Sequence, residues 1–263
     1  DLYETSTGWY RRILKMQKNG RTALRFEGVY MDSKVYVNGQ LVGEWKYGYS
    51  TFEFDITDYL NDGENLIAVR VDYRCPNTRW YSGAGIYRKV WLKQYNECHL
   101  VNDGIYISTE DGAVTVTAEV ERPEGVSVAE LSIRRTIMDG DKVLAEKTSP
   151  CCAFDKGRIP ELVRRNGCSY SVNTDVIEVK DPVLWDISAP KLYTCICEVI
   201  RGGEVVDCEE VKFGFRTVEF TTDMGFFLND RHVKLYGCCE HHDLGALGAA
   251  MNRTALARKL TTA

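Results

Sequence analysis

Apolar and polar residues alternate along most of the first hundred positions of this chain. In residues 34–42 the alternation runs on both sides of an Asn38-Gly39 pair. Such a pair between two alternating runs is a strong hairpin signal, because both residues tolerate a positive φ. Residues 52–56 and 65–71 continue the pattern. We therefore expect an antiparallel β-sandwich in this part of the chain.

A second group of short strands follows a polar joint at 97–104. Residues 114–120 place valine or alanine at every second position, with threonine or glutamate between them. This pattern predicts a strand with one buried and one wet face. Further strands are expected at 131–138, 169–179 and 192–200. Strands at this spacing are typical of a second sandwich of immunoglobulin size.

The chain changes character after Phe213. A small hairpin is expected at 226–230, then a strand, and then a helix at 254–260, where the composition favours helix. This is the one segment whose pattern predicts β followed by α.

Composition places the chain among ordinary globular proteins. Of its 263 residues, 44% are hydrophobic and 27% charged, so it should fold. A net charge of -5, with no run dense in lysine or arginine, argues against a nucleic-acid or anionic-membrane partner. No stretch approaches the roughly 20 apolar residues of a membrane span, and the first residues do not resemble a signal peptide.

The ten cysteines form no recognisable secreted disulfide framework. They include two vicinal pairs and one strand-spaced pair: Cys151-Cys152, Cys238-Cys239, and Cys195 with Cys197. We interpret them as mostly free thiols in a reducing compartment, which weakly favours the cytoplasm. The chain is also expected to begin inside a longer protein, so its localisation stays open.

Three motifs in the first ninety residues resemble one known family. They read GWYRR at 8–12, VYVNG at 35–39 and RWYSGAGIYR at 79–88. Together they are similar to the jelly-roll sugar-binding domain of glycoside hydrolase family 2. The ten-residue motif is highly specific.

Later motifs follow in the order of the same family. PVLW at 182–185 and FGFR at 213–216 resemble the end of its immunoglobulin-like domain. GFFLN at 225–229 and LYGCCEHHDLG at 235–245 resemble the first strand of its catalytic (β/α)8 barrel and the loop after that strand. The resemblance is closest to the β-galactosidase-like members.

The resemblance implies an all-β chain with a short α/β tail. Residues 1–97 would form the jelly-roll β-sandwich, residues 98–213 the immunoglobulin-like β-sandwich, and residues 214–263 the first strand and helix of an incomplete barrel. A barrel strand normally pairs on both sides. We therefore expect the segment from about Gly225 to be either poorly ordered or engaged in a contact with another chain, which would give a homo-oligomer.

The resemblance also implies a retaining hydrolase of β-galactosides or related β-glycosides, with no cofactor. Retention needs two carboxyl groups about 5 to 5.5 Å apart across the glycosidic bond. In the family both are glutamates on later barrel strands, which these 263 residues do not reach. The polypeptide is therefore expected to be inactive alone. A non-catalytic carbohydrate-binding module and an interaction scaffold remain alternatives.

Six residues are candidates for sugar contact in the whole enzyme: Asn77, Arg79, Trp80, His241, His242 and Asp243. The two histidines should follow the first barrel strand, on the face where barrel enzymes place their sites, and imidazole both donates and accepts hydrogen bonds. Asp243 is expected to orient a histidine or cap the loop. The alternative for the histidines is a pair of loop residues, one exposed and one packed.

The motif at 79–88 also allows two interpretations. An arginine fork can bind several hydroxyl groups, and an indole can stack on a sugar ring. In the family the corresponding loop reaches the rim of the active site. The alternative is a staple between domains, with Arg79 in a salt bridge and Trp80 buried.

Other conspicuous residues are expected to be structural. Trp9 and Tyr10 should be core residues of a strand, and Trp185 and Tyr193 should anchor the second sandwich. No metal site is expected at 238–243, because consecutive residues do not all face one ion and the ligand spacing of zinc sites is missing.

Overall fold

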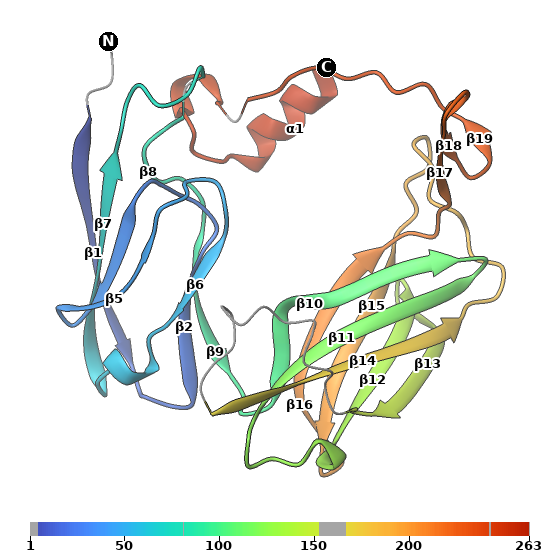
Figure 1. Ribbon diagram of the computed structural model, residues 1–263, viewed down its shortest axis with the longest axis horizontal. Helices are drawn as coiled ribbons and strands as arrows, with labels where there is room; N and C mark the ends of the chain where they lie inside the picture. Colours follow the sequence, from blue (N-terminus) through green and yellow to red (C-terminus); the bar gives the residue numbers. More distant parts are fainter. Residues whose placement is uncertain (1–4, 81, 153–166, 242, 263) are drawn as a thin grey trace. The chain divides into compact units, whose positions relative to one another are not determined.

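The computed structural model describes residues 5–80, 82–152, 167–241 and 243–262. The chain forms two compact units, residues 1–95 with 238–263 and residues 96–237 (Figure 1). Strands are the main secondary structure of both units, as the alternating patterns predict. Within the described ranges, no helix is long and apolar enough to cross a membrane.

The first unit contains an antiparallel four-stranded sheet and an antiparallel three-stranded sheet. The four-stranded sheet has the order β1 (Ser6–Met16), β7 (Gly63–Tyr73), β4 (Ser33–Val37) and β5 (Gln40–Trp45). The three-stranded sheet has the order β6 (Phe52–Asp55), β2 (Arg21–Phe26) and β9 (Val90–Tyr95). A short pair, β3 (Val29–Tyr30) with β8 (Gly85–Ile86), completes the unit.

The hairpin expected around Asn38-Gly39 is confirmed. It joins β4 to β5, and its two turn residues have φ values of 50° and 82°. Ser33, Val35 and Val37 of β4 are fully buried, while Lys34, which lies between Ser33 and Val35, faces outward. The local pattern therefore predicts both the turn and the buried face.

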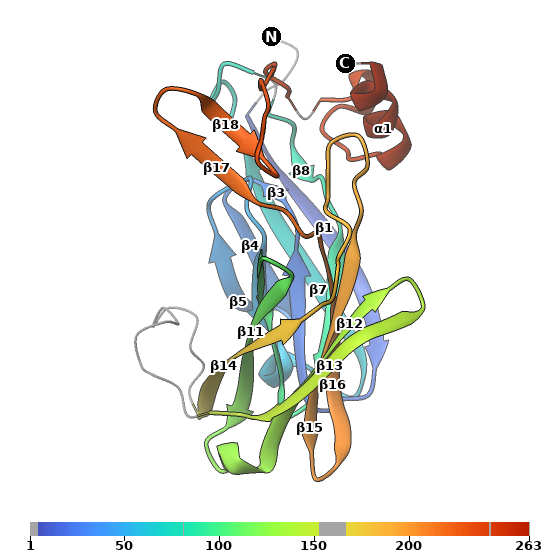
Figure 2. The ribbon, with the colours of Figure 1, turned by 90° about the vertical axis from the view of Figure 1, so that its right-hand side faces the viewer.

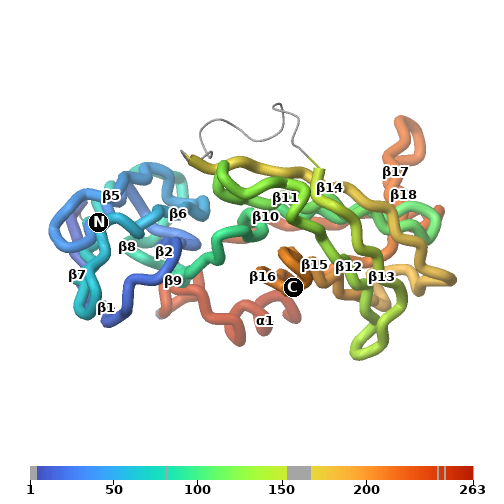
Figure 3. The backbone as a smooth tube through the Cα atoms, turned by 90° about the horizontal axis from the view of Figure 1, so that it is seen from below, coloured from blue at the N-terminus to red at the C-terminus, as the bar shows by residue number. Residues whose placement is uncertain are grey.

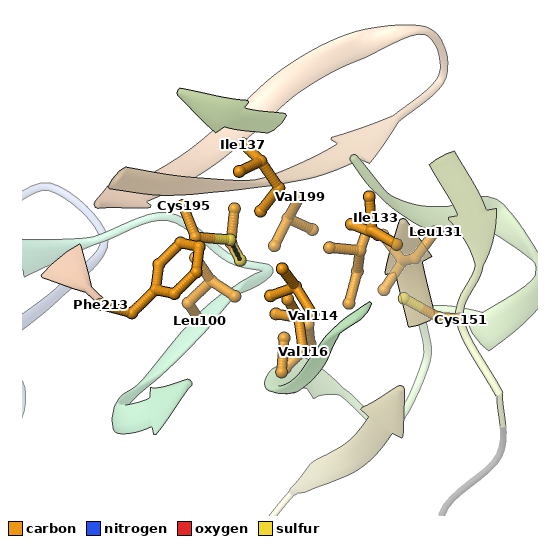
Figure 4. Close-up of a cluster of buried hydrophobic side chains, with 14 of the residues drawn as sticks. Leu100, Val114, Val116, Leu131, Ile133, Ile137, Cys151, Cys195, Val199 and Phe213 are labelled. Atoms are coloured by element: carbon orange, nitrogen blue, oxygen red, sulfur yellow. Dashed lines mark hydrogen bonds between the residues drawn. The ribbon is translucent and has the colours of Figure 1, made fainter. Parts of the chain in front are cut away.

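The second unit also has two antiparallel sheets, as the second group of strands predicts. One sheet has the order β10 (His99–Glu110), β11 (Ala113–Pro123) and β14 (Cys168–Glu178), which run as neighbours in Figure 3. The other has the order β13 (Lys142–Pro150), β12 (Leu131–Asp139), β15 (Tyr193–Arg201) and β16 (Glu204–Phe213). Their inner faces form the core shown in Figure 4.

That core confirms the prediction that residues 114–120, in β11, have one buried and one solvent-facing side. Val114 and Val116 of β11 are fully buried, and they lie near Ile133 and Val199 from the other sheet (Figure 4). Alternation at a period of two places these side chains on one face of their strand. Tyr193 is 3% exposed, as expected of a core anchor.

Gly214 allows a close approach just after β16. A Cβ at this position would lie 2.9 Å from Trp185 Cβ and 3.1 Å from the carbonyl oxygen of Lys191, which is too close for any other residue without a shift. Trp185 is only half-buried, and the Arg216 guanidinium lies 5.2 Å from its ring centroid.

A small sheet and one helix follow. The sheet contains β17 (Val218–Thr221), β18 (Gly225–Leu228) and β19 (Arg231–His232), and Figure 2 shows β17 and β18 as adjacent antiparallel arrows. The helix is α1 (Arg253–Thr262). Both the expected hairpin and the expected helix are confirmed. Residues 233–241, where a barrel strand is expected, form no strand; Val233 donates its backbone N–H to the carbonyl oxygen of Phe226 in β18 at 2.9 Å.

One expectation about packing is wrong. Trp9 and Tyr10 of β1 are 49% and 43% exposed, so they are not core residues. In the segment from Gly225 onward, Leu228 and Ala249 are buried, while Leu235 and Tyr236 are 63% and 84% exposed. The contact of this segment with another chain stays a prediction.

Candidate functional site

The loop after β7 carries three of the six candidate residues. Asn77 donates a hydrogen bond from Nδ2 to the Tyr30 hydroxyl at 2.9 Å. Thr78 closes the loop by donating from Oγ1 to the carbonyl oxygen of Trp80 at 2.7 Å. Tyr30 is 1% exposed, so it gives the loop a fixed base. The Arg79 and Trp80 side chains remain accessible to solvent.

A cluster of tyrosines supports this loop. The ring of Tyr30 lies 5.2 Å from that of Tyr49, and the Tyr87 hydroxyl donates to the carbonyl oxygen of Gly48 at 2.8 Å. Gly48 is needed there, because a Cβ would overlap the Tyr30 ring. Burial raises the pKa of Tyr87, and it also raises the pKa of Tyr49 although contacts with Trp80 and Ser82 oppose the shift. Tyr49 and Tyr87 are thus neutral at physiological pH.

Trp80 stacks on His241, far away in the sequence. Their ring centroids lie 5.2 Å apart, and the ring planes differ by 22°. Trp80 is 43% exposed, which contradicts the alternative in which it is a buried staple. The stack brings together the loop after β7 and the segment that resembles the loop of the first barrel strand.

The segment that carries His241 is anchored on the first unit. Gly83, with a φ of 72°, lies so close to Ala249 that a Cβ would overlap the alanine methyl group. Met251 donates its backbone N–H to the carbonyl oxygen of Tyr87, the residue after β8, at 3.5 Å. These contacts hold residues 245–251 against the loop.

Lysine 259 of α1 braces the same segment. Lys259 Nζ donates to the carbonyl oxygen of His241 at 3.2 Å and forms an ion pair with Glu240. The hydrogen bond to Glu240 raises the pKa of Lys259. The helix therefore positions the backbone at His241 and leaves its imidazole free to stack.

The structure brings together some of the candidate residues. It places Trp80 against His241 and holds Asn77 by a hydrogen bond in the same loop, while Arg79 and Asp243 are exposed. His242 lies outside the described residues. In the part of the chain that is described, no group of three or more metal-ligating side chains gathers in one place.

The sequence reasoning missed the residues that hold this site. Tyr30, Tyr49 and Ala249 were not singled out, although the Tyr-Gly-Tyr run at 47–49 was a signal of aromatic packing around a small residue. Chemically, an exposed indole beside an imidazole and an arginine suits a ligand with both apolar faces and hydroxyl groups.

Two family models match most of the chain. Residues 3–96 match "Glycosyl hydrolases family 2, sugar binding domain", and residues 99–216 match "Glycosyl hydrolases family 2". The chain belongs to glycoside hydrolase family 2. The resemblance of the motifs is therefore confirmed over both sandwiches.

Curated relatives agree with this family 2 assignment. A β-galactosidase of Bacteroides ovatus is 38% identical over 96% of this chain and 30% of its own length. A putative β-glucuronidase of Formosa agariphila is 36% identical over 98% of this chain and 24% of its own length. The family 2 chain thus spans about a third or less of the length of these relatives.

Solved structures share the fold of the family 2 chain. A family 2 member from Bacteroides cellulosilyticus superposes with a TM-score of 0.87 at 34% identity, over 97% of this chain and 32% of that one. A β-glucuronidase of Bacteroides uniformis gives a TM-score of 0.80 at 27% identity, over 99% of this chain and 32% of that one.

Proposed function

We propose that this chain is the sugar-binding and immunoglobulin-like portion of a retaining hydrolase that acts on β-galactosides or related β-glycosides. Membership of family 2 supports the reaction class, and the names of the relatives, β-galactosidase and β-glucuronidase, support the substrate class. The stack of Trp80 on His241 is the observation that carries the proposal, because it joins the sugar-binding domain to the loop expected beside the catalytic carboxylates.

The candidate residues have separate roles in this proposal. The exposed indole of Trp80 stacks on the apolar face of a sugar ring, and His241 exchanges hydrogen bonds with its hydroxyl groups. Asn77 and Arg79 add donors from the same loop, Arg79 through its planar fork. Asp243 orients an imidazole, and His242 is a second hydroxyl partner.

A polypeptide of these 263 residues is inactive by itself under this proposal. Retaining hydrolysis needs an acid/base carboxyl group and a nucleophilic one, and the family places both on later barrel strands. The test is incubation of the purified polypeptide with chromogenic β-galactoside and β-glucuronide. Turnover that rises in proportion to the polypeptide concentration and survives repurification would overturn this part of the proposal.

A non-catalytic carbohydrate-binding module is the second candidate, and the exposure of Trp80 favours it. An experiment that distinguishes the two candidate functions introduces the substitution Trp80→Ala into the longest naturally occurring form of the protein. A substrate rim predicts that kcat/KM for a chromogenic glycoside falls by about tenfold or more, since an aromatic contact is worth about 0.5 to 1.5 kcal/mol and misplacement adds to the loss. Unchanged kcat/KM together with weaker sugar binding would favour the module.

A further inference from the structure

The outer face of the sheet β1-β7-β4-β5 contains a polar pocket of about 240 Å³. Its charged wall residues lie on and beside the strands: Asp32, Lys34, Glu44, Lys46, Arg70, Asp72 and Arg74. These side chains share the outer face because successive residues of a strand point to opposite sides of the sheet. Val35 and Val69 point into the core, so their neighbours Lys34 and Arg70 point outward.

Ion pairs order the walls of this pocket. Lys34 Nζ lies 2.8 Å from Glu44 Oε1, and Arg70 Nη2 lies 3.0 Å from Asp72 Oδ1. The paired groups can form further hydrogen bonds to a ligand, because a guanidinium has five N–H donors and a carboxylate about four acceptor sites. Donors and acceptors thus alternate around a preformed hollow, which matches a ligand whose adjacent hydroxyl groups both donate and accept.

An exposed tryptophan lies on the same face of the sheet as the pocket. Trp9 of β1 lies directly opposite Arg70 in the register of β1 and β7, so both side chains are on the same face. Trp9 is 49% exposed, and its ring centroid lies 5.7 Å from that of Tyr36. An exposed indole beside alternating donors and acceptors suits the apolar face of a pyranose ring.

The charge of the pocket limits the kind of ligand. Four cationic side chains (Lys34, Lys46, Arg70, Arg74) face three carboxylates (Asp32, Glu44, Asp72), which leaves a net charge of about one positive unit. Binding of a polyanion depends on many unpaired cations. This surface instead suits a neutral sugar or a sugar with a single carboxylate.

We propose that this pocket, with Trp9 next to it on the same face of the sheet, binds a β-linked pyranoside that is neutral or carries one carboxylate. The ring stacks on Trp9, and its hydroxyl groups bond to the Arg70 and Asp72 side chains. The inference rests on the proposed function only for the class of ligand, and it uses none of the residues around Trp80 and His241.

Calorimetric titration of the 263-residue chain with methyl β-galactoside and methyl β-glucuronide tests the pocket. Trp9→Ala should weaken binding by about fivefold or more, Arg70→Gln should do the same, and the matched control Trp91→Ala, also an exposed tryptophan, should change it little. Preference between the two glycosides tells whether a carboxylate is recognised. Thermal unfolding by circular dichroism verifies that each variant is folded.

The outcomes separate this pocket from the proposed substrate rim. If Trp9→Ala and Arg70→Gln weaken glycoside binding and Trp80→Ala does not, the result supports the pocket, whatever kcat/KM shows for the substrate rim. If only Trp80→Ala weakens glycoside binding, the result overturns the proposed pocket and is consistent with the substrate rim. The absence of saturable binding by either glycoside, with all variants folded, also overturns the pocket.

Discussion

The guanidinium of Arg135, which is fully buried, donates a hydrogen bond from Nη1 to Asp175 Oδ2 at 2.6 Å. Arg135 belongs to β12 and Asp175 to β14, so the pair joins the two sheets of the second unit. Arg135 Nη2 also donates to Asn173 Oδ1 at 2.7 Å, and Ser149 donates to the Asp175 carboxylate. A buried charge with several partners of this kind is costly to break.

We expect Arg135→Met to lower the free energy of unfolding by about 3 to 5 kcal/mol, because it leaves the Asp175 carboxylate buried with fewer partners. Arg134→Met is the matched control on the same strand. Arg134 pairs with Glu198 at 2.6 Å, but its side chain is 34% exposed to screening solvent, so its loss should cost far less than that of Arg135. Urea unfolding of both variants measures the difference, and similar losses would contradict the prediction.

Acid sensitivity should depend on the same carboxylate. Burial alone would raise the pKa of Asp175, but hydrogen bonds from Ser149 and Lys147 and the charge of Arg135 lower it below its usual value. A group whose pKa is lowered by folding stabilises the protein above its unfolded pKa, and this stability is lost as the pH falls through the lower folded value.

We therefore expect the unfolding free energy to fall less steeply below about pH 4 in Asp175→Asn than in the unmodified chain. Urea unfolding at several pH values between neutral and acid conditions measures both slopes. Asp141→Asn, which removes an exposed carboxylate, is the control and should leave the slope unchanged. If the unfolding free energy falls equally steeply with acid in Asp175→Asn and in the unmodified chain, Asp175 is not the source of the acid sensitivity.

The contact of Gly83 with Ala249 should matter for the segment that carries His241. Gly83→Ala places a methyl group at positive φ and into Ala249, so it should cost about 1 to 3 kcal/mol more than the φ strain alone. Gly39→Ala is the control, since it has the same kind of φ strain, at 82°, but open space around it. Equal losses in the two variants, measured by urea unfolding, would show that the contact is unimportant.

Thiol reactivity should follow burial. We expect Cys152, Cys238 and Cys239, which are exposed, to react quickly with a disulfide reagent at neutral pH. Cys151 should be inert until unfolding, because burial raises its pKa to about 11. Cys208 should react more slowly than its exposure implies, because partial desolvation and nearby carboxylates raise its pKa.

The measurement is the time course of colour release in native buffer and in denaturant. All ten thiols should react in denaturant, since none of the cysteines forms a disulfide. A native burst that includes Cys151, identified by mass spectrometry of the labelled peptides, would be incompatible with its position in the core.

The sequence by itself determined the strands and the hairpin at Asn38-Gly39. These features depend on local properties, namely a period of two and the tolerance of particular residues for tight or left-handed backbone. The family motifs also indicated which loop and which segment carry the candidate residues. Whether the candidate residues bind sugar stays a prediction.

Only the tertiary structure decided which side chains meet and which remain exposed. Trp9 follows the pattern of a buried strand residue but lies on an outer face, and Arg135 is charged but fully buried. Trp80 stacks on His241 although the two residues lie far apart in the sequence. Such outcomes arise from register and packing between distant segments, which a local pattern of polarity does not encode.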